Sequence, residues 1–517
     1  MKNLFILLAA AMVSMTSCKK FLATEPADFI SPENYFNTES DLNKSLTGVY
    51  DALAQDGTFS RNLVLELAHS SDEGFYKRDD NVITPFVYNY DGSHAIIQAC
   101  WRQLYQGINR ANLLLANVNK PSMNESRRAA IKGQALFLRA YMYFLLVSNW
   151  GDVPLLLDPT SSAENVNIPR TPSARIFEQI TRDMEEAQTL VQRISDIGFS
   201  GRVSKTAVQG ILARVYLKWA GQPLNDASKY QLAKNWADSV VQSGEHVLAA
   251  DYKQIFINHT ADKYDIKESM WEIEFYGNNA NGVDREGSRF VNQISVKQLN
   301  NDYGYGYGIL GVTGVLYNKY TDPNDVRRDW TIAPYSYQGN NTNIKVAKAS
   351  TDIYTREVGK WRREYETVLP YAREWGPGNF PMLRYADVLL MFAEAENQIN
   401  GPTATAHLYL NMVRARANAS QYTGANTISD KTTFQEVIMD ERSRELAFEG
   451  LRKGDLIRWG VFIPFMKNVR TDITSNAPSS VAYGVRAYNN VSQRHVLLPI
   501  PSLEIALNKS MVQNPGW

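Results

Sequence analysis

Cysteine is the scarcest of the chemically versatile side chains in this 517-residue sequence. It occurs only as Cys18 and Cys100. Two thiols exclude both a disulfide framework and a cluster of thiolates around zinc. The chain also has no excess of charge of either sign, since it contains 54 basic and 54 acidic residues. A balanced chain has no overall field that attracts nucleic acid or an anionic bilayer, so we expect no nucleic-acid partner.

Long apolar runs and the common cofactor motifs are also missing. After Gly151 no apolar run reaches the length of about 20 residues that spans a bilayer. No phosphate-binding loop, dinucleotide fingerprint or nucleophile elbow occurs in a suitable strand context. His407 has no second ligand at metal spacing, and DPND at residues 322–325 lacks EF-hand spacing and indicates a turn. We therefore expect no cofactor and assign no metal.

The first residues have the pattern of a targeting segment. A short basic start, MKN, precedes an apolar core over residues 4–13, which is the order found in secretory signal peptides. MTSC at residues 15–18 then resembles a bacterial lipobox, with Met15 where that pattern usually has Leu. We predict a lipoprotein signal peptide over residues 1–17 and lipidation of the Cys18 thiol. Plain secretion with Cys18 left free is the alternative.

Helical periodicity dominates the chain on both sides of its middle third. Between residues 38 and 243 apolar side chains recur at spacings of three and four. Small residues mark the predicted helix pair over residues 203–243, at Ala207, Gly210, Ala213, Ala233 and Ala237. Such pairs are typical of tetratricopeptide arrays. Near the C-terminus we expect Pro381 to open a helix, Gly401-Pro402 to end it, and the capping-box spacing TFQE at residues 433–436 to begin another.

The pattern changes between residues 251 and 379. MWEIEF at residues 270–275 alternates like a short strand, and YGYGYG at residues 303–308 lies among loops rich in Asn, Gly and Tyr. The strand and helix patterns together predict a mainly α fold. We expect a tetratricopeptide-like helix-pair array with a loop-rich inserted subdomain that contains short β-strands.

Several motifs carry a family resemblance. RYADVLL at residues 384–390 with AEA at 393–395, then ERSRELAFEG at 441–450 and RKGDLIRW at 452–459, resemble the two signatures of the SusD/RagB family. NWGDVPL at residues 149–155 is similar to a third feature of that family. The family consists of outer-membrane nutrient-binding lipoproteins. The likeness implies a signal peptide over 1–17, an N-terminal SusD-like helical region over 18–250, a loop-rich insertion over 251–379 and a C-terminal SusD/RagB helical region over 380–517.

A neutral glycan must be held by aromatic rings and by hydrogen bonds to its hydroxyl groups, because it offers no charge. Two loop neighbourhoods supply such side chains, and the resemblance implies that both border one face. The candidate ligand-binding residues are Asp72, Tyr76, Arg78, Tyr88, Tyr90, Tyr303, Tyr305, Trp330 and Tyr335. In the alternative interpretation the tyrosines of the YGYGYG repeat only cover the core.

The resemblance implies a non-catalytic binding protein. It would be anchored by lipid to the outer membrane, facing the exterior, and would capture oligo- or polysaccharide for a SusC-like TonB-dependent transporter. A helical glycoside hydrolase or lyase is one alternative, because Glu441 and Glu445 lie one helical turn apart. Several arginines crowd that segment, which instead favours a structural ion-pair network. A peptide-binding tetratricopeptide adaptor is the other alternative.

Overall fold

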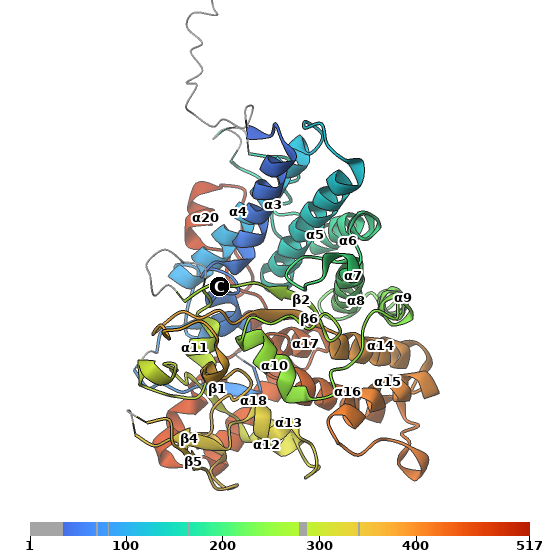
Figure 1. Cartoon of the computed structure of the whole chain (residues 1–517). Helices are drawn as coiled ribbons and strands as arrows, with labels where there is room; N and C mark the ends of the chain where they lie inside the picture. Colours follow the sequence, from blue (N-terminus) through green and yellow to red (C-terminus); the bar gives the residue numbers. More distant parts are fainter. Residues whose placement is uncertain are drawn as a thin grey trace, which may run out of the picture.

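The computed structural model describes residues 35–68, 71–80, 82–160, 162, 166–278, 287–339 and 342–517. The predicted signal peptide and the predicted lipidation site at Cys18 lie outside these residues. Within them the chain is mainly helical, with three two-stranded antiparallel sheets (Figure 1). The predicted fold class is therefore confirmed, whereas the predicted division into regions at residues 250 and 380 stays a prediction.

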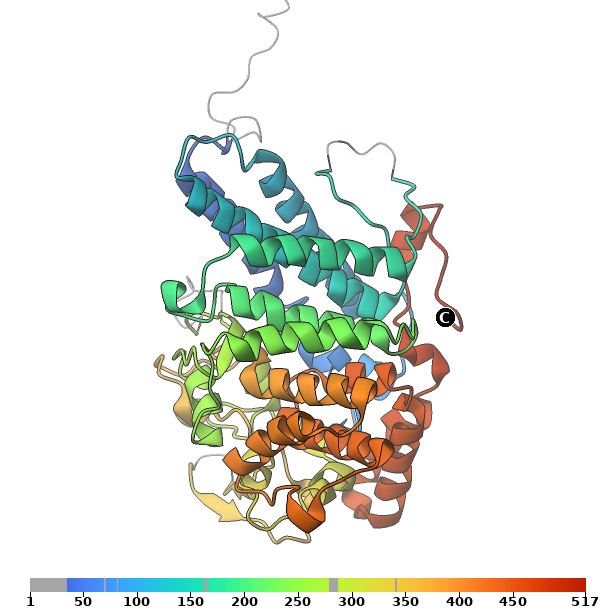
Figure 2. The same ribbon diagram turned by 90° about the vertical axis from the view of Figure 1, so that its right-hand side faces the viewer.

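Long helices stack side by side into one array, which Figure 2 shows most clearly. From α3 to α9 each long helix packs on the next one along the chain, and α9 packs on α14 across the insertion. α14 then packs on both α15 and α16. The helices of the array are α3 (Glu39–Ala54), α4 (Ala95–Asn117), α5 (Glu125–Trp150), α6 (Ser173–Leu190), α8 (Lys205–Ala220), α9 (Lys229–Gln242), α14 (Tyr385–Asn400), α15 (Ala404–Arg416) and α16 (Lys431–Leu446).

Local sequence explains both where these helices begin and how closely they pack. Thr38 closes a capping box with Asp41 at the start of α3, because each side chain accepts a hydrogen bond from the other's backbone N–H. Gly210 of α8 lies where Leu383 crosses the helix, and a Cβ atom there would come within 2.5 Å of a Leu383 methyl carbon. Gly210 is therefore required where the end of β6 (Phe380–Arg384) crosses α8.

One helix among the described residues, α5, is apolar and long enough to cross a membrane by composition alone. In this structure 83% of its most apolar stretch is buried inside the protein. Trp150 at its end is fully buried and donates its indole N–H to the Pro499 carbonyl oxygen, 3.0 Å away. α5 is therefore a central helix of the array.

The insertion is held at its base by β2 (Ser269–Ile273), which pairs with β6 (Phe380–Arg384). The prediction that Pro381 opens a helix is wrong, since α14 begins only at Tyr385. Pro381 is extended because its segment pairs with β2, and both strands of a two-stranded sheet are edges, where proline is tolerated. The predicted strand at residues 270–275 corresponds to β2.

Two further sheets organise the loops of the insertion. β1 (Gly74–Tyr76) pairs with β3 (Leu310–Val312), and β4 (Tyr335–Tyr337) pairs with β5 (Lys345–Ala347). The first pair joins the early loop to the insertion, although more than 230 residues of sequence separate them. The short helices of the insertion are α10 (Tyr252–Thr260), α11 (Phe290–Ile294), α12 (Gly314–Lys319) and α13 (Arg327–Thr331).

The C-terminal part of the chain is made of α16 and a series of shorter helices. α16 begins after Asp430, whose carboxylate accepts the Thr433 N–H at 2.7 Å, so the helix starts earlier than the predicted capping box. The remaining helices are α7 (Ile194–Ile197), α17 (Arg452–Arg458), α18 (Phe462–Asn476), α19 (Arg486–Asn490) and α20 (Ser502–Leu507), with η1 (Leu63–Ala68), η2 (Pro85–Val87), η3 (Asn301–Tyr303), η4 (Ile353–Thr355), η5 (Arg363–Tyr365), η6 (Gly424–Asn426), η7 (Ser479–Val485) and η8 (Gln493–Val496).

Candidate functional site

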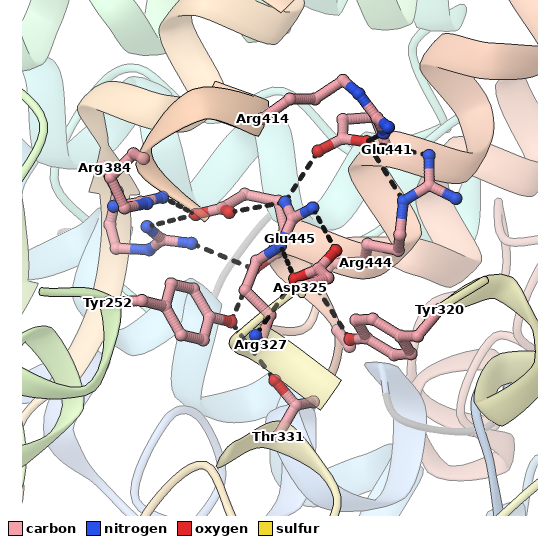
Figure 3. A network of polar contacts seen from close by, with 12 residues as sticks. Tyr252, Tyr320, Asp325, Arg327, Thr331, Arg384, Arg414, Glu441, Arg444 and Glu445 are labelled. Carbon is pink, nitrogen blue, oxygen red and sulfur yellow. Dashed lines mark hydrogen bonds and ion pairs between the residues drawn. The ribbon is translucent and has the colours of Figure 1, made fainter. Parts of the chain in front are cut away.

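The two glutamates considered as catalytic acids lie in a buried ion-pair network (Figure 3). Arg327 of α13 is at its centre, with one guanidinium nitrogen 2.7 Å from Glu441 and 3.1 Å from Glu445. The same arginine pairs with Asp325 at 2.7 Å. Arg384 binds Glu445 at 3.0 Å. All five side chains are at most 1% exposed, so this network joins the insertion to the centre of the C-terminal helices.

The arginines keep both glutamates ionised. Burial by itself raises the pKa of Glu441, but Arg327, Arg444 and Arg414 together lower that pKa to about 2. Burial opposes ionisation of Glu445 too, and its neighbouring arginines hold its pKa well below the usual range. A carboxylate that holds no proton at neutral pH cannot act as a general acid. The structural interpretation of this pair is confirmed.

A second group of contacts fixes the insertion against α16. The Tyr320 hydroxyl donates to the Arg444 carbonyl oxygen at 2.9 Å. The Lys360 ammonium is fully buried and donates to Glu449 at 2.6 Å and to the Ala447 carbonyl oxygen at 2.9 Å. Loops anchored by buried ion pairs hold their outer side chains in fixed positions, which suits a preformed binding surface.

Three predicted ligand residues of the early loop lie in the core. Asp72 is 1% exposed and binds the Arg452 guanidinium through both oxygens, each at 2.8 Å. Burial raises its pKa, but Arg452 outweighs burial and the pKa is lowered. Tyr88 is 1% exposed, and Tyr90 is 6% exposed and packs against Trp517. In this structure these side chains serve packing and charge pairing, although we expected them in a loop that binds the ligand.

Tyr76 and Arg78 of the same early loop lie nearer the surface. Because β1 pairs with β3, Arg78 reaches the YGYGYG segment and donates to the carbonyl oxygens of Tyr307 and Gly308. Tyr76 is half-buried and stacks on Phe86 with the ring centroids 5.0 Å apart. The two predicted neighbourhoods thus meet at this edge.

Cations cover the rings of Trp330 and Tyr335. Trp330 is 5% exposed, donates its indole N–H to the Lys360 carbonyl oxygen at 3.1 Å, and has the Arg362 guanidinium 3.8 Å from its ring centroid. Tyr335 is 7% exposed, with the Lys345 ammonium 4.6 Å from its ring centroid. A sugar could stack on these ring faces only after the cations move aside.

Tyr303 and Tyr305 remain the accessible predicted aromatics. Tyr303 is 37% exposed. Tyr305 and Tyr307 are half-buried and in edge-to-face contact with the centroids 5.0 Å apart, and the exposed Arg373 guanidinium lies 4.9 Å from the Tyr305 ring. We call this surface the tyrosine strip and define it by Arg78, Tyr303, Tyr305, Tyr307, Tyr335, Tyr337, Arg362 and Arg373.

Part of the tyrosine strip lines a small groove. The groove, lined by Tyr303, Tyr335, Tyr337 and Arg362, encloses about 10 Å³, room for about one water molecule. Arg362 and Arg373 were not predicted from the sequence. Each lies within two residues of a tryptophan, in WRR at 361–363 and REW at 373–375, and this proximity is the local signal that could have identified them.

A larger cleft of about 900 Å³ lies between α3 and β2. Its lining includes Tyr50, Asp51, Arg202, Glu274 and Trp375. These residues come from segments far apart in sequence, so no local motif indicates the cleft. The Tyr50 hydroxyl is already bonded to Gln134 at 2.8 Å, and Arg202 covers its ring at 4.5 Å from the centroid.

The fold defines the class of protein: a tetratricopeptide-like helix array that carries a loop-rich insertion. The chain belongs to the SusD family. The model described as SusD family matches residues 267–517, and a second, described as starch-binding associating with outer membrane, matches residues 20–217.

Named relatives agree with this assignment. The chain is 27% identical to SusD-like protein P25 of Formosa agariphila, over 97% of this chain and 96% of that protein. It is 28% identical to the starch-binding protein SusD of Bacteroides thetaiotaomicron, over 31% of this chain and 26% of that protein. The crystal structure of a SusD homolog from Bacteroides thetaiotaomicron superposes with a TM-score of 0.87 at 27% identity, covering 94% of this chain and 98% of that one.

Proposed function

We propose that this protein captures oligo- or polysaccharide without cleaving it and passes it to a SusC-like TonB-dependent transporter. The observation that carries the proposal is the tyrosine strip, an open aromatic surface on rigidly anchored loops. Family membership supports a binding role, since one matched family description is of starch binding. The Arg-paired state of Glu441 and Glu445 removes the acid pair that a hydrolase would need from this segment.

The shape of the strip favours a polymer as ligand. Enclosed pockets surround most of a small ligand, whereas this groove encloses almost no space. A chain of sugars can lie across Tyr303 and Tyr305 and contact successive rings and side-chain donors. Tyr76 and Arg78 extend the same surface toward the early loop.

The location and the partner are parts of the same proposal. We propose that lipidated Cys18 anchors the protein to the outer membrane, facing the exterior. The family description of association with the outer membrane supports this location. Fractionating cells that produce Cys18→Ala tests the anchor, because we expect that variant to leave the membrane fraction. Co-purification of the transporter with the wild-type protein tests the partner.

An affinity panel tests the capture role. The soluble protein beginning after Cys18 should be retarded in gels that contain at least one polysaccharide, with no new reducing ends in the mixture. Tyr303→Ala and Tyr305→Ala should each weaken binding roughly tenfold, because truncation of a central aromatic contact costs more than about 1 kcal/mol. Tyr276→Ala is the matched control, since Tyr276 is 66% exposed and lies outside the strip.

Two results would contradict the proposal. Release of reducing ends that survives repurification would make the protein an enzyme. If the protein bound a peptide mixture and no polysaccharide retarded it, the fold assignment would stand. The proposed glycan ligand would then be wrong, and the ligand would be a peptide.

A further inference from the structure

Three guanidinium groups of the tyrosine strip lack an acidic partner. No carboxylate among the described residues lies within 4 Å of Arg78, Arg362 or Arg373. Neighbouring cations behave differently, since Lys77 pairs with Glu357 at 2.6 Å and Lys345 pairs with Glu364 at 2.8 Å. Both lysines thus have a carboxylate partner, whereas these three arginines have none within 4 Å among the described residues.

The unpaired arginines are held in place by other contacts. Arg362 donates from Nε to the Gly359 carbonyl oxygen at 2.8 Å and from Nη2 to the Trp330 carbonyl oxygen at 3.3 Å, while its guanidinium lies over the Trp330 ring. Arg78 is bonded to backbone carbonyl oxygens. Arg373 lies over Tyr305, and contact with the Tyr307 hydroxyl raises the pKa of its guanidinium.

The chemistry of this arrangement points to an oxyanion. A guanidinium presents a planar fork of donors that matches carboxylate and sulfate groups, and it stacks on aromatic rings while doing so. Glu364 lines the same groove as Arg362, but its carboxylate is bonded by the Lys345 ammonium and the Tyr337 hydroxyl. Nε and Nη2 of Arg362 already donate to carbonyl oxygens, which leaves its Nη1 and the exposed Arg373 guanidinium to bind anionic groups of a ligand.

We infer that the cargo is an acidic glycan, with carboxylate or sulfate groups bound by Arg362 and Arg373. This inference rests on the proposed function and narrows its ligand class. Tyrosine rings then contact the sugar faces, and the two arginines select for charge.

Paired polysaccharides that differ only in charge test the inference. Polygalacturonate is compared with its methyl ester, and chondroitin sulfate with its desulfated form, so that the two arms separate carboxylate from sulfate. If carboxylates are bound, we expect the methyl ester to bind roughly tenfold more weakly than polygalacturonate; if sulfates are bound, we expect desulfated chondroitin, which keeps its carboxylates, to bind roughly tenfold more weakly than chondroitin sulfate. Hydrogen bonds to charged groups are among the strong ones. Binding of the acidic polymer should also weaken as sodium chloride rises toward about 0.5 M.

Arginine variants test which side chain binds the acidic groups of the polymer. Arg373→Gln should weaken binding of the acidic polymer roughly tenfold, and Arg373→Lys should recover part of the loss because it keeps the charge without the fork. Arg175→Gln is the matched control, because the Arg175 side chain is 69% exposed on α6, outside the strip. Arg373 is exposed, so its variants should fold, and a thermal melt checks this. The salt dependence of the wild-type protein gives an independent readout.

The outcomes separate this inference from the proposed function. Equal binding of charged and neutral partners, unaffected by Arg373→Gln, would overturn the inference and leave glycan capture in place. Failure to bind any polysaccharide would overturn the proposed function itself.

Discussion

Arg327→Ala is expected to lower the free energy of unfolding by about 3–5 kcal/mol, the range for breaking a buried ion pair from one side. The substitution leaves Asp325, Glu441 and Glu445 buried with one cation fewer among them. Uncompensated charge in a dry interior has no water to stabilise it. Urea unfolding followed by tryptophan fluorescence measures the change.

The adjacent arginine provides the control. Arg328 is 31% exposed and pairs with Asp329, which is 53% exposed. Exposed pairs contribute about 0–1 kcal/mol, so Arg328→Ala should unfold close to the wild type. Similar midpoints for the two variants would mean that the network around Arg327 does not hold the insertion in place.

Stability should fall on both sides of a maximum between about pH 4.5 and 6.5. The pKa of Glu441 is about 2 in the folded protein, below its ordinary value of 4.5. The unfolded chain therefore binds the proton first as the pH falls, and stability is lost from about pH 4.5 down toward 2. Burial raises the pKa of Glu73 to about 8 and that of Glu272 to about 7. These two stay protonated in the fold while the unfolded chain ionises. Burial lowers the pKa of His259 and of His495 to about 3, which offsets them up to about pH 6.5, so stability falls as the pH rises from about 6.5 to 8.

Urea midpoints across this range check the prediction. A tenfold difference in proton affinity between the folded and unfolded states is worth about 1.4 kcal/mol, so each limb should be about 2 kcal/mol deep or more. Glu73→Gln should flatten the alkaline limb, because glutamine cannot ionise. Glu125→Gln is the control, since the Glu125 side chain is 79% exposed. A flat profile in the wild type would show that these groups titrate alike in both states.

The helical array could be predicted well from the sequence because its signals are local. Thr38 and the apolar stripe behind it define α3, and small residues such as Gly210 mark close helix contacts. Pro381 shows where local reasoning fails. Its extended conformation depends on β2, more than 100 residues earlier, and a pairing over that distance leaves no mark in the local pattern.

The candidate surface was predicted only in part for the same reason. Tyr303 and Tyr305 were predicted because aromatic side chains on loops beside Asn and Asp suit sugar binding, and the structure leaves Tyr303 exposed and Tyr305 half-buried. Asp72 has the same loop context, yet Arg452 from the other end of the chain draws it into the core. Arg362 covers Trp330 from 32 residues away. The burial of a side chain and the accessibility of an aromatic ring depend on such distant partners. The periodicity of the sequence contains no information about them.

A crystal structure of the protein with a bound oligosaccharide would locate the binding surface. We expect sugar rings against Tyr303 and Tyr305, with an acidic group within hydrogen-bond distance of Arg373. A glycan lying instead in the cleft between α3 and β2, against Tyr50 and Trp375, would contradict the assignment of the tyrosine strip as the binding surface.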